Sequence, residues 1–201
     1  MMDMPRFSVS YGRIRLRPLL PTDHPSFATY RADPQVARYQ GFAPYTAADA
    51  AAFIEANAQT PIPPEPGQWV QLALTRAADG VLLGDCALHR QAAEPRFGEF
   101  GITLAPAWQG QGYAREAVLA LLGYCFEELV LHRVLALTDV RNQGCVHLLE
   151  SVGMRREAHF QHNGWYKGEW CDELQYALLA TEWAQRSTPA SPDEKIGAPN
   201  P

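Results

Sequence analysis

The feature that most constrains the fold is a pair of glycines between a predicted strand and the longest helical pattern in the chain. Residues 97–104 are typical of a strand, Pro106 ends it, and Gly110 and Gly112 precede a helix predicted over residues 113–129. The apolar residues of that helix recur every three or four positions and form one stripe: Val118, Leu121, Leu122, Cys125, Phe126 and Leu129. A glycine turn before a helix exposes backbone N–H groups at the positive end of the helix dipole. The segment therefore predicts a site for a diphosphate ligand.

The glycine pattern excludes two common kinds of phosphate site. No Gly-Lys-Ser/Thr follows the turn, so it is not a P-loop. Arg115 stands where a dinucleotide-binding loop has its third glycine, and the segment lies in mid-chain instead of after a first strand. The two glycines alone also fit an ordinary turn into a helix.

The remaining pattern predicts alternating strands and helices in one domain. Strands are predicted over residues 12–19, 69–75, 81–89, 97–104, 133–138, 154–162 and 171–180, and helices over 24–30, 34–39, 47–58, 113–129 and 143–152. This order indicates an α/β fold with a mixed sheet and helices on both faces. Residues 1–184 are expected to form the single domain, and residues 185–201, rich in proline and serine, a mobile tail.

Composition limits the class of partner. The net charge of −5 and the pI near 5.7 argue against nucleic acid and fit, weakly, a positively charged partner such as an amine. The four cysteines form no CxxC pair and no cluster with metal-ligand spacing, so no metal is expected. No apolar segment is long enough to span a membrane, and the first residues lack a signal-peptide core. A cytoplasmic location is therefore expected.

The residues around the glycines resemble a known family. The run Gln109-Gly110-Gln111-Gly112-Tyr113-Ala114 is similar to the Gln/Arg-x-x-Gly-x-Gly/Ala signature of the GNAT superfamily of N-acetyltransferases. Residues 98–106 resemble the family's strand before this loop, and Asn142-x-x-Cys145 its later helix. Arg17-Pro18-Leu19 and residues 172–178 resemble the branch that acetylates the N-termini of ribosomal proteins. The resemblance implies a mostly antiparallel sheet of about seven strands with four to five helices, splayed between the fourth and fifth strands.

The resemblance also implies that the chain binds acetyl-coenzyme A. Gly110 and the main-chain amides of Gln111, Gly112, Tyr113, Ala114 and Arg115 would hold the pyrophosphate, with Gln109 shaping the loop. Thr103 and Leu104 would pair with the pantetheine arm as an added strand does. Asn142 would hydrogen-bond the cofactor, cap the following helix, or do both.

The implied reaction moves acetyl onto a primary amine, either a protein N-terminus or a small molecule, by direct attack in a ternary complex. Glu99, on the motif strand, is the first candidate for the base. The alternatives are Glu157, Glu169, Asp172 and Glu173, and each of these carboxylates also fits solvated surface.

The acid for the leaving thiol is where the sequence departs from the family. Leu149 occupies the position where many relatives have a tyrosine, so Cys145 is the candidate that would protonate the leaving sulfur. Cys145 also fits a small buried helix residue.

Several alternatives stay open. The absent tyrosine fits a catalytically silent acyl-coenzyme A sensor, and the glycine turn fits a nucleotide-binding enzyme. Trp165, Tyr166 and Trp170 line an acceptor pocket, form an oligomer contact or simply pack, and the family resemblance allows a homodimer.

Overall fold

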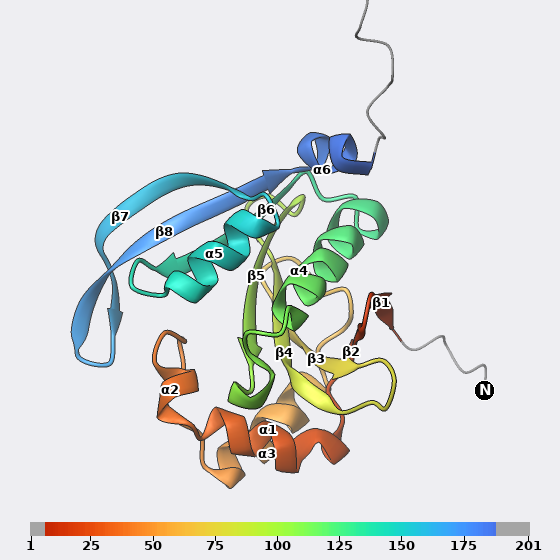
Figure 1. Ribbon diagram of the computed structural model, residues 1–201, viewed down its shortest axis with the longest axis vertical. Coiled ribbons are helices and arrows are strands. Elements are labelled where there is room, and N and C mark those ends of the chain that lie inside the picture. Colours follow the sequence, from red (N-terminus) through yellow and green to blue (C-terminus); the bar gives the residue numbers. More distant parts are fainter. Residues whose placement is uncertain (1–6, 188–201) are drawn as a thin grey trace, which may run out of the picture.

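The computed structural model describes residues 7–187, which form one eight-stranded mixed sheet with the order β1-β2-β3-β4-β5-β6-β8-β7 (Figure 1). The strands are β1 Val9–Tyr11, β2 Ile14–Pro18, β3 Trp69–Arg76, β4 Leu82–Arg90, β5 Phe97–Leu104, β6 Arg133–Asp139, β7 Arg155–Tyr166 and β8 Glu169–Leu179. Every neighbouring pair is antiparallel except β5 and β6, which run parallel. The mixed, mostly antiparallel sheet that the sequence predicts is confirmed.

Helices cover both faces of the sheet. They are α1 His24–Arg31, α2 Pro34–Ala37, α3 Ala47–Asn57, α4 Tyr113–Gly123, α5 Gln143–Ser151 and α6 Ala180–Ser187, with 3-10 turns at Pro21–Asp23 and Pro106–Trp108. Alternate residues of β3 show the two faces, because Leu72 and Leu74 belong to the core with α4 while Ala73 packs with α1 and α3.

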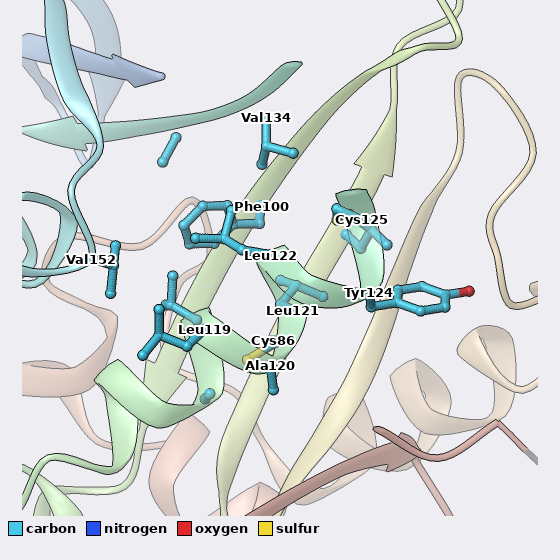
Figure 2. Close-up of a cluster of buried hydrophobic side chains, with 14 of the residues drawn as sticks. Cys86, Phe100, Leu119, Ala120, Leu121, Leu122, Tyr124, Cys125, Val134 and Val152 are labelled. Atoms are coloured by element: carbon cyan, nitrogen blue, oxygen red, sulfur yellow. The ribbon is translucent and has the colours of Figure 1, made fainter. Parts of the chain in front are cut away.

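The larger core lies between the sheet and α4. The predicted stripe on α4 is buried from Val118 to Phe126, and Figure 2 shows Leu121, Leu122 and Cys125 of this helix with Phe100 of β5 and Val134 of β6. The helix ends in a π turn over Tyr124–Glu128, in which Leu129 N donates to the carbonyl of Tyr124.

Two elements were not predicted. Strand β1 has only three residues and is folded back on β2 around Gly12, whose φ is 54°. Helix α6 covers the first three residues of the predicted tail. It is held by Trp183, which stacks on Phe126 at 5.8 Å and donates to Glu127 Oε1 at 2.8 Å. The rest of the predicted tail, residues 188–201, lies outside the described residues, and so do residues 1–6.

Within residues 7–187, no helix combines the length and the apolar character that crossing a bilayer requires.

Candidate active site

The glycine turn opens α4 in the way the sequence predicts. Gly110 and Gly112 have φ angles of 72° and 86°, and Gly112 is the N-cap residue of α4. These are left-handed conformations that glycine adopts without steric cost. Apart from Gly110 and its two chain neighbours, no atom of residues 7–187 lies within 4 Å of the place that a Cβ on Gly110 would occupy. The loop therefore leaves a cradle in front of the first N–H groups of α4.

Side chains within the loop fix its shape. Gln109 Nε2 donates to the carbonyl of Leu104 at 3.0 Å, and Gln111 Nε2 donates to the carbonyl of Ala107 at 2.8 Å. Both amides thus bind the loop itself, which fits the shaping role predicted for Gln109. Ala114, the second residue of α4, lines the cavity described below together with Gln109.

Arg13 of the β1–β2 turn binds the glycine loop and the start of α4, and the sequence did not indicate this role. Its guanidinium donates to the carbonyl of Gln111 at 2.8 Å and pairs with Glu116, and it lies 4.3 Å from the centre of the Tyr113 ring. Tyr113 is buried beneath it, and Arg115 lines a separate groove beside α6. The side chains of Tyr113 and Arg115 therefore do not line the cavity, and only their main-chain amides belong to the cradle.

Strands β5 and β6 separate below the glycine loop. Their parallel pairing covers Phe97–Glu99 of β5 and Arg133–Leu135 of β6 and then ends, although both strands continue. A cavity of about 460 Å³ occupies the gap. It is lined by both strands, by the loop at Gln109 and Gly110, by the start of α5, and by residues 35, 36, 39 and 40. The splay is thus between the strands that the sequence analysis counted as fourth and fifth.

The register decides which main-chain groups of β5 face this gap. Ala105 N donates to Leu83 O of β4 at 2.9 Å, so Ala105 and, by alternation, Thr103 direct their main-chain groups toward β4. The main-chain groups of Ile102 and Leu104 then point into the gap. Leu104 is oriented as predicted for pairing with a ligand, whereas Thr103 offers the cavity only its side chain.

The segment after α2 forms one wall of the cavity. Tyr39 and Gln40 line it, and Gln40 Nε2 donates to the carbonyl of Ile102 at 3.2 Å. This contact joins residues 62 positions apart and confirms that the Ile102 carbonyl points away from β4. No pattern in the sequence indicated a role for Gln40.

The start of α5 forms the opposite wall. Asn142 Oδ1 accepts a hydrogen bond from Cys145 N at 3.2 Å, so the capping role weighed for Asn142 is confirmed, and Asn142 also lines the cavity. Cys145 is half-buried and also lines the cavity, and burial raises the pKa of its thiol. Leu149 is fully buried in the same helix and carries no proton donor.

Glu99 lies where β5 and β6 part, next to the first cavity-lining residue, Phe100. Burial raises the pKa of its carboxyl, and the nearby Glu173 carboxylate raises it further. His89, its partner across β4, places Nδ1 4.0 Å from Glu99 Oε2. That nitrogen is buried, and it is the one buried side-chain polar atom in residues 7–187 without a hydrogen-bond partner. Burial also lowers the pKa of His89, so the ring is neutral near pH 7.

Glu173 of β8 is only 8% exposed and is held by two neighbours. Asn163 Nδ2 and the Tyr166 hydroxyl each donate to one of its oxygens, the latter at 3.2 Å. A bulge in β7 between Phe160 and Gly164 brings Asn163 to this position. The charge of the buried Glu173 thus acts on the half-buried Glu99, and the sequence did not indicate this coupling.

The other three candidate carboxylates are engaged elsewhere. Glu157 pairs with Arg133 and Arg155, Glu169 pairs with Arg141, and Asp172 accepts from the His162 main chain and contacts His159. Trp165 and Trp170 face each other across the β7–β8 hairpin at 5.2 Å and are more than half exposed. Neither tryptophan lines the cavity.

Comparison with known proteins agrees with this geometry. Residues 13–155 match the acetyltransferase (GNAT) domain family. An uncharacterized N-acetyltransferase of Bacillus subtilis, YnaD, is 31% identical over 175 residues, 87% of this chain and 98% of that protein. The crystal structure of a GNAT-family acetyltransferase from Bacillus anthracis superposes with a TM-score of 0.78 at 27% identity, over 88% of this chain and all of the other.

Two further relatives match about half of the chain. The spermidine N(1)-acetyltransferase of Vibrio cholerae is 34% identical over 100 residues, 50% of this chain and 54% of that protein. The putative ribosomal N-acetyltransferase YdaF of Bacillus subtilis is 32% identical over 105 residues, 52% of this chain and 57% of that protein. The family resemblance predicted from the glycine loop is confirmed, and this chain is an N-acetyltransferase of the GNAT family.

Proposed function

We propose that this chain binds acetyl-coenzyme A between β5 and β6 and transfers the acetyl group directly to a primary amine. The observation that carries the proposal is the cavity itself. It runs from the glycine loop at Gly110 to Phe100, next to the point where the two strands part; Glu99, the residue before Phe100, does not line it. Acetyl-coenzyme A would supply the thioester. Residues of the chain would bind the cofactor, take the proton from the amine and protonate the leaving sulfur.

The residues present fit this cofactor. A Cβ at Gly110 would meet no protein atom, so the space before α4 can accept a phosphate, and the N–H groups from Gln111 to Arg115 can bind it. The main-chain amides of Ile102 and Leu104, whose carbonyls accept from Gln40 and Gln109, offer a strand edge to an extended amide-containing arm. Asn142 can donate to the same arm through its Nδ2 group.

Glu99 is proposed to take the proton from the amine. A raised pKa makes its carboxylate a stronger base, and a free α-amino group needs little help because its pKa is about 8. The neutral His89 ring, with Nδ1 4.0 Å away and without a hydrogen bond, would accept the proton from Glu99 once the two side chains move to hydrogen-bond distance. Glu173 adds negative charge that favours the arrival of an ammonium group.

Cys145 is proposed to protonate the leaving sulfur. Its raised pKa keeps the thiol protonated near pH 7, so that a proton is present when the thiolate leaves, and makes it a poor nucleophile. A covalent acetyl-cysteine route is therefore disfavoured, and direct transfer in a ternary complex is preferred.

The acceptor is proposed to be a peptide N-terminus or a small-molecule amine, since relatives named for each of these match the chain. A catalytically weak acyl-coenzyme A sensor is the second candidate, because the buried Leu149 leaves the usual tyrosine position without a proton donor. A cytoplasmic location, a homodimer and a single domain over residues 1–184 are further proposals, taken from the sequence and the family.

The test measures binding and turnover separately. Isothermal titration of acetyl-coenzyme A into wild type and into Gly112→Trp reports the cradle, and release of free thiol in the presence of spermidine or an Ala- or Ser-initiated peptide reports transfer. Binding and thiol release by the wild type, with slow release by Glu99→Gln, support the enzyme. Tight binding without release on any amine favours the sensor, and absence of binding by the wild type overturns both.

A further inference from the structure

The turn that joins β7 and β8 contains a lysine in a conformation that lysine does not favour. Tyr166 and Glu169 are the last paired residues, so the loop between them consists of Lys167 and Gly168 alone. Both have positive φ angles, 52° and 85°, as in a type I′ turn. Asparagine followed by glycine is the preferred sequence for such a turn, and a lysine at its first position costs stability. The turn itself therefore does not explain why a lysine stands here.

The Lys167 ammonium binds a distant part of the chain. Its Nζ donates to the carbonyls of Ala37 at 2.7 Å and Gln40 at 2.8 Å, and the carbonyl of Arg38 lies 3.5 Å away. These carbonyls belong to the end of α2 and the segment that follows it, about 130 residues earlier in the chain. Figure 1 shows the β7–β8 hairpin curving away from the sheet so that its tip reaches the vicinity of α2. One ammonium group thus ties the tip of the hairpin to this segment.

The bound segment is the wall of the cavity. Tyr39 and Gln40 line it, and Gln40 donates through its side chain to the carbonyl of Ile102 on the open edge of β5. Gln40 is therefore held twice, by Lys167 at its main-chain oxygen and by Ile102 at its side chain. The contacts form a continuous path from the hairpin tip to the strand edge at the cavity.

We propose that Lys167 is a positioning residue that holds residues 37–40 against the cavity and thereby sets the affinity for the acceptor amine. The inference rests on the proposed function, because the hairpin tip lies on the side of the proposed base. Tyr166, next to Lys167, donates to Glu173, whose charge acts on Glu99. The wall at Tyr39 and Gln40, which Lys167 binds, is therefore assigned to the acceptor side of the cavity. Lys167 touches neither the glycine cradle nor Glu99 in the described contacts, so it acts through the segment it binds. The ammonium group of Lys167 performs this role, and the conformation of the turn does not.

Two substitutions at the same position separate these roles. Lys167→Asn gives the turn its preferred sequence, so the hairpin folds at least as well, but it removes the ammonium. Lys167→Arg keeps the charge and several N–H donors at the same unfavourable φ, and is the matched control. No other lysine lies within residues 7–187, since Lys195 is outside them, so loss of the ammonium has no nearby substitute.

The first readout does not depend on activity. Hydrogen exchange of the amides in residues 37–42 is compared among the wild type and both variants, without any ligand. We expect exchange at least about tenfold faster in Lys167→Asn, as loss of a hydrogen bond to a charged donor implies, and near-wild-type exchange in Lys167→Arg. Equal exchange in the wild type and the asparagine variant would overturn the proposal.

The second readout uses whichever of spermidine or the Ala- or Ser-initiated peptide the wild type acetylates. We expect Lys167→Asn to raise the KM for the amine about tenfold, with kcat and the dissociation constant of acetyl-coenzyme A within about twofold of the wild type. A fall in kcat at unchanged KM, or equal losses in the arginine variant, contradicts a positioning role. If the wild type acetylates neither amine, the proposed function fails, while hydrogen exchange still decides whether Lys167 holds the segment.

Discussion

Replacing Gly110 by alanine tests whether the glycine turn holds a phosphate group. The Cβ of this variant meets no protein atom within 4 Å, so the change brings no clash. The remaining cost to folding is that of an alanine at a φ of 72°, about 1–2 kcal/mol. The protein should therefore fold, with its free energy of unfolding reduced by that amount.

The expected loss of cofactor affinity follows from the position of the added methyl group. Gly110 lines the cavity immediately before α4, so the methyl occupies space in which a phosphate oxygen would approach the loop amides. Loss of one hydrogen bond to a charged group costs about 1.5–3 kcal/mol. At 25 °C this corresponds to a dissociation constant about 10- to 150-fold higher.

A second glycine provides the control. Gly80, between β3 and β4, has a φ of 74°, has no atom within 4 Å of its virtual Cβ, and does not line the cavity. Gly80→Ala thus carries the same backbone cost at a site without a proposed ligand. Isothermal titration with coenzyme A and urea unfolding are run on both variants. Wild-type affinity in Gly110→Ala, or an equal loss in Gly80→Ala, would refute the phosphate cradle.

Three other predictions concern the acid–base groups and the fold. Glu173→Gln removes a charge that raises the pKa of Glu99, so the pKa of Glu99 should fall. Because the base must be unprotonated, the acidic limb of the pH profile of kcat/KM should move to lower pH. An acidic limb that does not move speaks against Glu99 as the base. Cys145→Ala should lower kcat about 100-fold and Cys145→Ser nearly as much, because a hydroxyl is a far weaker acid than a thiol; a fully active alanine variant would show that the thiol only fills space. Asp85 pairs with the buried Arg31 at 2.6 Å, and Asp85→Asn leaves this arginine without its counter-charge. The free energy of unfolding measured in urea should fall by about 3–5 kcal/mol. A loss below about 1 kcal/mol would contradict the ion pair.

The parts of the fold that could be predicted depend on local sequence. The stripe on α4, the glycine turn before it and the capping role weighed for Asn142 follow from the spacing of neighbouring residues. Strand β1 has three residues, too few to show a period, and α6 carries mostly polar residues, so its anchoring by Trp183 on Phe126 was not visible in advance.

The parts of the site that could not be predicted depend on long-range register. Arg13, His89 and Lys167 reach their positions through contacts with residues that are distant in the sequence or in another strand. The orientation of Thr103 depends on which β5 residues bond to β4, and a shift of one residue would reverse it. Such choices are made by the assembled sheet and leave no signal in one sequence.

The separation of β5 and β6 also links the stability of the folded protein to the binding of its acetyl donor. Ile102 and Leu104 lie on a strand edge inside the sheet. Their carbonyls accept hydrogen bonds from the side chains of Gln40 and Gln109, while their amides face the gap. A donor that completes this edge stabilises the folded state by mass action, by about 2.7 kcal/mol at a concentration one hundred times its dissociation constant. Amide protection along β5 and survival against proteases should therefore rise and fall with the supply of acetyl-coenzyme A, so that a cell poor in acetyl groups would also hold less of this protein.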